Sequence, residues 1–176
     1  MKTYLLCWTM VALVARGACA GIQIGLTEHQ KENSTNEWGA VTYNTQISLG
    51  LTGPQREFKT NQVIDLLVRI RNLSTNEDYS VGVQTPFTAT EDVSFLVISP
   101  SGKDISPVFH SSFRFSGGVV WVHPGQVDGF VFQLGEICRM EEVGTYKIVM
   151  RAVRRPRDRH RSFEVLSNPL YFSVVP

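Results

Sequence analysis

The sequence predicts an all-β protein, an antiparallel β-sandwich of about seven to nine short strands. From Trp38 onward, apolar residues alternate with polar ones, and turn residues separate the alternating stretches. No convincing amphipathic helix interrupts this pattern. The chain has 176 residues, of which 14 are glycine and 8 are proline, as expected for one turn-rich domain.

The first 20 residues have the features of a cleaved signal peptide. Lys2 gives a basic start, an apolar run follows over residues 4–15, and Ala18-Cys19-Ala20 ends in the small-x-small pattern that signal peptidase accepts. The run is too short for a bilayer, which takes about 20 apolar residues. We therefore expect a secreted or periplasmic protein without a membrane span.

Two alternatives remain open for this segment. Residues 1–20 could instead form a buried N-terminal helix. Cys19 could also carry a lipid anchor, because Gly17-Ala18-Cys19 resembles the end of a bacterial lipobox. Arg16 argues against the lipid, since a lipobox has an aliphatic residue at that position.

Cleavage after Ala20 would leave a domain that is almost neutral and has one thiol. Loss of Lys2 and Arg16 leaves 15 basic residues against 16 acidic ones. Such a domain has no global field that would attract nucleic acid or membranes. Of the three cysteines only Cys138 remains, so no internal disulfide can form.

Residues 21–37 lack periodicity and are expected to form a flexible N-terminal lead or a weak edge segment, followed by a sandwich domain over residues 38–176. The first strand is expected from Trp38 to Leu51, ended by Gly53-Pro54. The clearest strand is at residues 64–71, where aliphatic residues alternate with Asp65, Arg69 and Arg71. Further strands are expected at residues 80–85, 94–99, 119–122, 127–134, 144–152, 162–166 and 170–175.

One short motif specifies the kind of sandwich. Glu142-Val143-Gly144-Thr145-Tyr146 resembles the acid-x-Gly-x-Tyr corner that opens the penultimate strand of many immunoglobulin-like domains. There the glycine permits the turn and the tyrosine hydroxyl returns to nearby backbone. Antibody-type domains have a cysteine two residues later, whereas this chain has Ile148. The motif therefore predicts an immunoglobulin-like sandwich outside the disulfide-bonded group.

A longer stretch, residues 58–153, resembles secreted bacterial sandwich domains and the bacterial intracellular proteinase inhibitor family. The shared features are Arg71-Asn72-Leu73-Ser74 after an apolar strand, a Ser-Gly turn after Phe95, a Pro-Gly turn at Pro124 and the Gly144-x-Tyr146 corner. The resemblance implies the fold more than inhibitory activity. A presequence departs from an intracellular role, and no reactive-loop motif is recognisable.

The densest charged cluster is an arginine-rich segment at residues 151–161. Pro156 bars a continuous helix, so the segment is expected to be a loop between two strands. Guanidinium groups bind phosphate, sulfate and carboxylate in bidentate geometry. The segment is either a solvated loop that discourages edge pairing or an anion-binding tip formed by Arg151, Arg154, Arg155, Arg157, Arg159 and Arg161. It lacks interleaved aromatic residues for base stacking, so no nucleic-acid partner is expected.

No catalytic site, metal site or cofactor is predicted. The four histidines have no two-histidine ligand spacing, and no Gly-x-Ser-x-Gly elbow is present. Cys138 is either a buried small hydrophobe or a reactive or intermolecular thiol. Asn33-Ser34-Thr35 and Asn72-Leu73-Ser74 fit the glycosylation pattern, which matters only in a eukaryotic host.

Aromatic residues could also form a carbohydrate-stacking platform, although such residues more often fill a sandwich core. The candidates are Trp38, Trp121, Phe130 and Phe132.

The leading functional hypothesis is an exported, non-enzymatic module that presents loops or a sheet edge to a partner protein. An anion or acidic-polysaccharide binder acting through residues 151–161 is the alternative, and proteinase inhibition is a third hypothesis.

Overall fold

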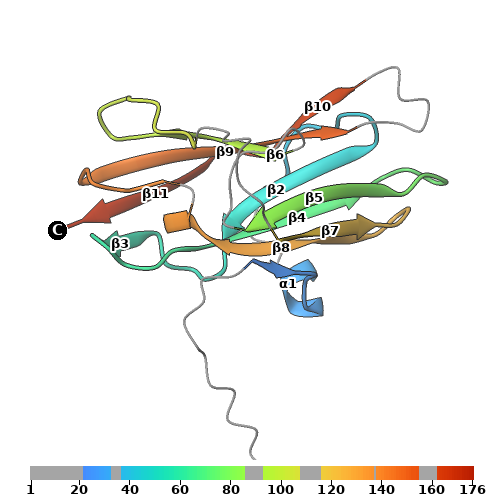
Figure 1. The fold of residues 1–176 in the computed structure, drawn as a ribbon, viewed down its shortest axis with the longest axis horizontal. Helices are drawn as coiled ribbons and strands as arrows, with labels where there is room; N and C mark the ends of the chain where they lie inside the picture. The colour runs from blue at the N-terminus through green and yellow to red at the C-terminus, as the bar shows by residue number, and fades with distance from the viewer. Residues whose placement is uncertain (1–21, 33–36, 86–92, 108–115, 137, 155–161) are drawn as a thin grey trace, which may run out of the picture.

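The computed structural model describes residues 22–32, 37–85, 93–107, 116–136, 138–154 and 162–176. These residues form an all-β sandwich, which confirms the predicted fold class. Its strands lie in two facing layers, and the only described α-helix is a short one on the outer side of one layer (Figure 1).

One layer is a four-stranded sheet in the order β1-β8-β4-β2. Its strands are β1 (Gln23–Ile24), β8 (Val127–Gln133), β4 (Asp65–Asn72) and β2 (Thr45–Leu51). Neighbouring strands in this sheet are antiparallel.

The other layer is organised around the long strand β9 (Gly144–Arg154). It pairs antiparallel with β6 (Val93–Ile98), β10 (Phe163–Leu166) and β11 (Leu170–Val175). The short strand β3 (Glu57–Lys59) then pairs parallel with β11. A separate antiparallel ribbon contains β5 (Tyr79–Thr85) and β7 (Ser116–Val122).

Alternating apolar residues from both layers form the core. Along β4, Leu66, Val68 and Ile70 are fully buried, as their period-two spacing predicts. Phe95 of β6 and Phe132 of β8 pack with their ring centroids 5.1 Å apart, which joins the two layers. Burial of these side chains is the main force holding the layers together.

Two polar side chains complete connections that the sequence indicated. The Tyr146 hydroxyl donates to the carbonyl of Glu142 at 2.9 Å and accepts from its amide at 3.0 Å, so the predicted return of the tyrosine to the backbone is present. Asn168 lies in the break between β10 and β11. Its side chain accepts from the Leu49 amide and donates to the Leu49 carbonyl, which links this break to β2.

The strand expected from Trp38 to Leu51 is wrong in its first half. The chain reverses at Tyr43 and Asn44, which have φ values of 45° and 55°, and Thr42 and Thr45 exchange backbone hydrogen bonds across the turn. Both central residues of a type I′ turn need positive φ. Asn favours that conformation, but Tyr gave no turn signal. Val41 and Tyr43 are therefore exposed instead of sharing the core face.

The described part of the expected N-terminal lead is folded onto the sandwich. β1 pairs with β8, and the Leu26 amide donates to Asp128 at 3.0 Å. The short helix α1 (Glu28–Glu32) follows, and neither element was predicted as such. Among the described residues, no helix has the length and apolar character needed to cross a membrane.

Candidate functional site

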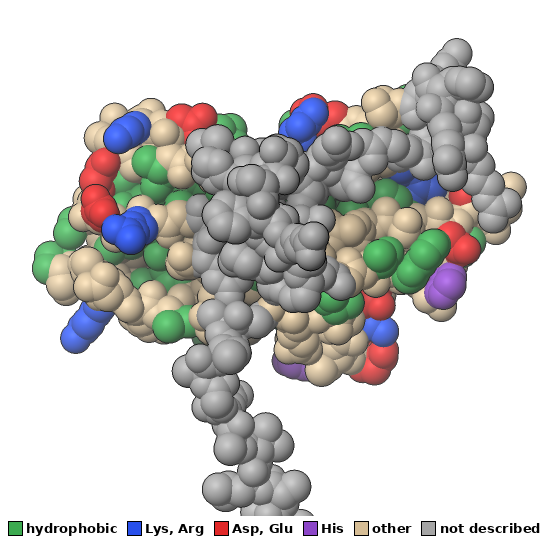
Figure 2. Space-filling view, viewed as in Figure 1, with side chains coloured by type: hydrophobic (Ala, Val, Ile, Leu, Met, Phe, Trp, Pro, Cys, Tyr) green, Lys and Arg blue, Asp and Glu red, His purple; other side chains and the backbone are tan. Residues whose placement is uncertain are grey.

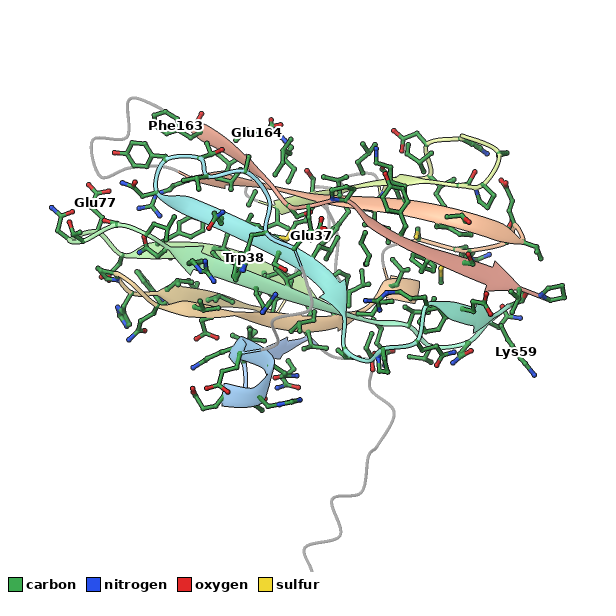
Figure 3. All side chains as sticks on the ribbon, turned by 180° about the vertical axis from the view of Figure 1, so that it is seen from behind. Glu37, Trp38, Lys59, Glu77, Phe163 and Glu164 are labelled. Carbon is green, nitrogen blue, oxygen red and sulfur yellow. The ribbon has the colours of Figure 1, made fainter. Side chains whose placement is uncertain are left out.

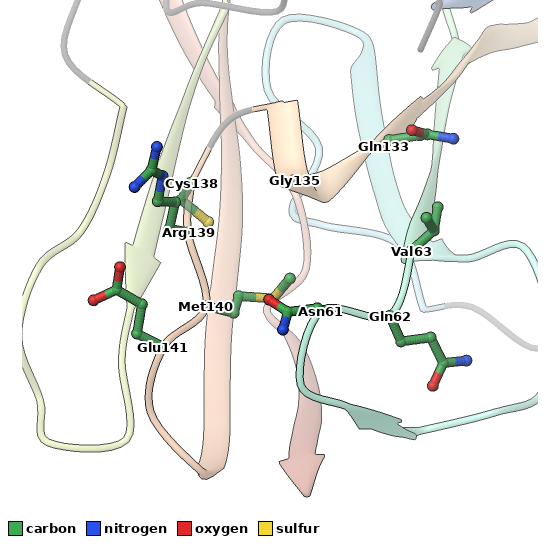
Figure 4. Close-up of a pocket in the computed structure, with 9 residues that line it drawn as sticks. All are labelled: Asn61, Gln62, Val63, Gln133, Gly135, Cys138, Arg139, Met140 and Glu141. Carbon is green, nitrogen blue, oxygen red and sulfur yellow. The ribbon is translucent and has the colours of Figure 1, made fainter. Parts of the chain in front are cut away.

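The largest hollow near one end of the sandwich has a volume of about 440 Å³. Three separate segments form it: the β3–β4 loop, the end of β8 with the 3-10 turn η1 (Leu134–Glu136), and the segment that leads into β9 (Figure 4). Its lining residues are Asn61, Gln62, Val63, Gln133, Gly135, Cys138, Arg139, Met140 and Glu141. A volume of this size is typical of a ligand pocket.

Local structure accounts for the position of each wall. Asn61 has φ of 66°, and the Gln62 amide donates to the Lys59 carbonyl, so a tight turn projects the β3–β4 loop over the hollow. On the opposite wall, Met140 points toward Asn61 (Figure 4). Met140 and Cys138 also pack against the core, which fixes that wall.

The lining combines amides, apolar groups and one charge of each sign. The amides of Asn61, Gln62 and Gln133 can each donate and accept hydrogen bonds. Val63 is 61% exposed, so its side chain is available for contact. This mixture matches a peptide segment, whose backbone needs both donors and acceptors and whose side chains can be apolar.

A second hollow of about 160 Å³ lies beside the first. Gln62 and Val63 line both hollows and so form a ridge between them. The remaining walls of the smaller hollow come from Leu51, Thr52, Gly53, Gln55, Phe58 and Asp65. The two hollows therefore form one divided surface rather than two unrelated depressions.

The thiol in the larger hollow is a poor nucleophile. Burial raises the pKa of Cys138 to about 11, because the surrounding protein disfavours the thiolate. The thiolate is the reactive form of cysteine. The structure therefore favours the interpretation of Cys138 as a small hydrophobe on the pocket wall.

Two sheet edges are occupied by groups of the chain itself. At the outer edge of β3, the Gln62 side chain accepts from the Lys59 amide and Gln55 donates to the Glu57 carbonyl. At the edge of β6, the Ile105 amide donates to the Val97 carbonyl, and the Ser106 hydroxyl accepts from the Val97 amide. These backbone groups are not available for an added strand.

The arginine-rich segment is only partly described. Arg155, Arg157, Arg159 and Arg161 lie outside the described residues, so their anion-binding role stays a prediction. Arg151 is half-exposed at the start of the segment and forms an ion pair with Glu164 across β9 and β10.

Arg154 does not have the exposed placement that an anion-binding tip requires. Its side chain is 2% exposed, its Nη1 donates to Thr45 at 2.9 Å, and its Nη2 lies 3.6 Å from a Glu77 carboxylate oxygen. The guanidinium also lies over the rings of Tyr43 and Tyr79, at 5.4 and 4.9 Å from their centroids. The guanidinium is thus held by groups of the protein itself.

The aromatic candidates separate into three environments. Phe130 and Phe132 belong to the core. Trp38 is half-buried on the outer side of the four-stranded sheet, with the Arg71 guanidinium 4.2 Å from its ring centroid (Figure 3). Trp121 is 56% exposed and is the only one of the four that is available as an open surface.

The glycosylation pattern at Asn72 coincides with a structural side chain. Asn72 is fully buried, and its amide nitrogen donates to the carbonyls of Glu77 and Val122. A glycan could not be accommodated at this position in the folded domain. Asn33, in the other pattern, lies outside the described residues.

The residues placed by the structure form no group of three or more histidine, cysteine, aspartate or glutamate side chains that could hold a metal ion. No protein-family model matches the chain, and no curated protein matches it. Sequence reasoning identified Cys138 but missed the Asn61–Val63 wall. A Thr-Asn-Gln turn between two strands was the only local signal of that wall.

Proposed function

We propose that the mature chain is an exported, non-enzymatic binding domain whose ligand is an extended segment of a partner protein. The supporting observation is the divided surface at one end of the sandwich, where Gln62 and Val63 separate hollows of about 440 and 160 Å³. Export rests on the signal-peptide pattern of residues 1–20.

The spacing of an extended chain suits a divided surface. Side chains on one face of an extended segment repeat about every 7 Å, so two of them can straddle a ridge that is one side chain wide. The larger hollow would accept a bulky apolar residue and the smaller one a short residue. The amides of Asn61, Gln62 and Gln133 would then bond to the backbone of the segment, as in other peptide-recognition sites.

The chemistry of the hollow supports binding rather than catalysis. Glu141 is the only carboxylate that lines the larger hollow, no histidine lines it, and the raised pKa of Cys138 keeps the thiol protonated at neutral pH. A catalytic site would need a nucleophile or a general base within reach of a substrate.

The occupied edges indicate how a partner would bind. Because the edges of β3 and β6 are bonded to the chain's own groups, the proposed contact is made through side chains and loop amides. Strand addition, the simplest mode expected from the sequence, is therefore not the mode proposed at these edges.

The proposal is tested by capture from the extracellular fraction of the source organism with biotinylated protein. The wild type should retain a specific protein, and Val63→Arg should lower the retained amount at least tenfold, because the long cation blocks the ridge. Leu96→Arg is the matched control, since Leu96 is an exposed apolar residue on β6, away from the hollows.

Equal capture by the wild type and Val63→Arg would show that the divided surface is not the binding site. A supporting result must also be repeated with the purified partner, by titration calorimetry at a 1:1 ratio. Thermal unfolding of each variant verifies that both arginine substitutions leave the fold intact.

A further inference from the structure

The outer face of the β5–β7 ribbon presents an isolated apolar platform. Trp121 and Val119 alternate with the buried residues Val120 and Val122, and they are 56% and 48% exposed. Directly across the ribbon, Trp121 faces Ser80 and Val119 faces Gly82. A Cβ atom placed on Gly82 would have no neighbour within 4 Å, so the surface beside Val119 is open.

Polar groups border this platform at the end of the ribbon. The Nδ1 atom of His123 lies 2.9 Å from an Asp78 carboxylate oxygen, and both side chains are exposed. His123 is two residues beyond Trp121, and Asp78 is two residues before Ser80, so the pair continues the same face. Figure 2 shows hydrophobic side chains beside a histidine and acidic side chains over β5 and β7.

The size and charge of the platform limit what can bind there. Together the exposed parts of Trp121 and Val119 offer roughly 200 Å². A standard protein interface buries about 800 Å² on each partner. The charged groups on this face are one aspartate and one histidine in contact, so the face has no excess charge that would select a polyanion.

We propose that this face binds an uncharged polysaccharide by stacking a pyranose ring on Trp121. The ring face of tryptophan carries negative electrostatic potential, which attracts the C–H groups on one side of a pyranose ring. Asp78 and His123 then accept from and donate to hydroxyls of the next sugar, and Ser80 and Gly82 leave room for the chain. This site is separate from the divided surface and does not depend on the partner proposed there.

The test is affinity electrophoresis of the mature protein in gels containing mixed-linkage β-glucan, xylan or galactomannan, with pull-down on microcrystalline cellulose and chitin. At least one of these polysaccharides should retard or retain the wild type. Trp121→Ala should weaken that binding at least tenfold, and Trp121→Phe should keep part of it. Gly82→Arg should weaken it severalfold by covering the open surface.

Tyr171→Ala is the matched control, because Tyr171 is another exposed aromatic residue, 52% exposed on β11. It should bind as the wild type does, and 0.5 M NaCl should not weaken binding. The proposal is overturned if no polysaccharide in the panel binds, or if Trp121→Ala binds as tightly as Tyr171→Ala. It is also overturned if sedimentation shows a dimer that Trp121→Ala abolishes, since a second copy would then occupy the face.

Discussion

The two ends of the sandwich solve the same packing problem in different ways. At the end marked by Glu77 and Phe163, side chains close the space between the layers, whereas the end marked by Lys59 leaves the divided surface (Figure 3). Arg154 fills the closed end with a guanidinium that contacts Tyr43, Tyr79, Thr45 and Glu77. The comparison teaches that the arginines of this chain act partly as packing residues, and that space is left elsewhere.

A second guanidinium supports this conclusion. Arg69 is 2% exposed on the outer side of β4, where it donates to Ser48 at 3.1 Å and lies 4.9 Å from the Trp38 ring centroid. Burial lowers its pKa, and the nearby charge of Arg71 lowers it further. Arginine is suited to such positions, because its planar group can stack and donate several hydrogen bonds at once.

The largest expected effect comes from removing the guanidinium that fills the closed end. Arg154→Ala should lower the free energy of unfolding by about 2–4 kcal/mol, because it leaves a cavity and removes the partner of Glu77. Urea denaturation measures this difference. Arg151→Ala is the control on the same strand, and it should cost less than about 1 kcal/mol because its ion pair with Glu164 is exposed. Equal costs for the two variants would contradict the packing role of Arg154.

The core was predictable because strand alternation is a local property. The apolar positions of β4 and the corner at Tyr146 lie within a few residues of one another, so their pattern can be read from a short segment. The same alternation contained an overlooked signal. Arg154 falls on the face shared by Tyr146, Ile148, Met150 and Ala152, all of which are buried.

The hollow was not predictable because its walls come from distant parts of the chain. Asn61 and Met140 are brought together only when β3, β8 and β9 have paired with their neighbours. The turn at Tyr43 was missed for a different reason. Tertiary contacts favour its positive φ, since the Tyr43 ring stacks on Phe163 with a centroid distance of 4.4 Å.

A smaller effect should distinguish the open end by the reactivity of its thiol. Because the pKa of Cys138 is about 11 rather than 9.0, the thiolate fraction near neutral pH should be roughly 100-fold lower than for an ordinary thiol. Alkylation should therefore keep rising about tenfold per pH unit beyond pH 9. Mass spectrometry after iodoacetamide treatment measures the rate, with circular dichroism to verify folding. A rate that levels off near pH 9 would indicate an open, solvated thiol and a differently formed hollow.

The smallest effect concerns the corner beside the open end. Ser101 donates to Glu142 through its hydroxyl and its amide, and the Ser99 hydroxyl also donates, which lowers the pKa of Glu142 below 4.5. A lowered pKa in the folded state means that the carboxylate contributes stability above pH 4.5 and loses that contribution as the pH falls below it. Glu142→Gln should therefore melt slightly below the wild type at pH 6.

This difference in melting temperature should shrink between pH 4.5 and pH 3, because the wild-type side chain becomes protonated over that range. Glu141→Gln, which changes the adjacent exposed glutamate, is the matched control and should follow the wild-type pH profile. A Glu142→Gln deficit that stays constant down to pH 3 would mean that the hydrogen bonds from Ser99 and Ser101 do not depend on the charge. The corner would then depend on Tyr146 alone, whose hydroxyl bonds only to the backbone of Glu142.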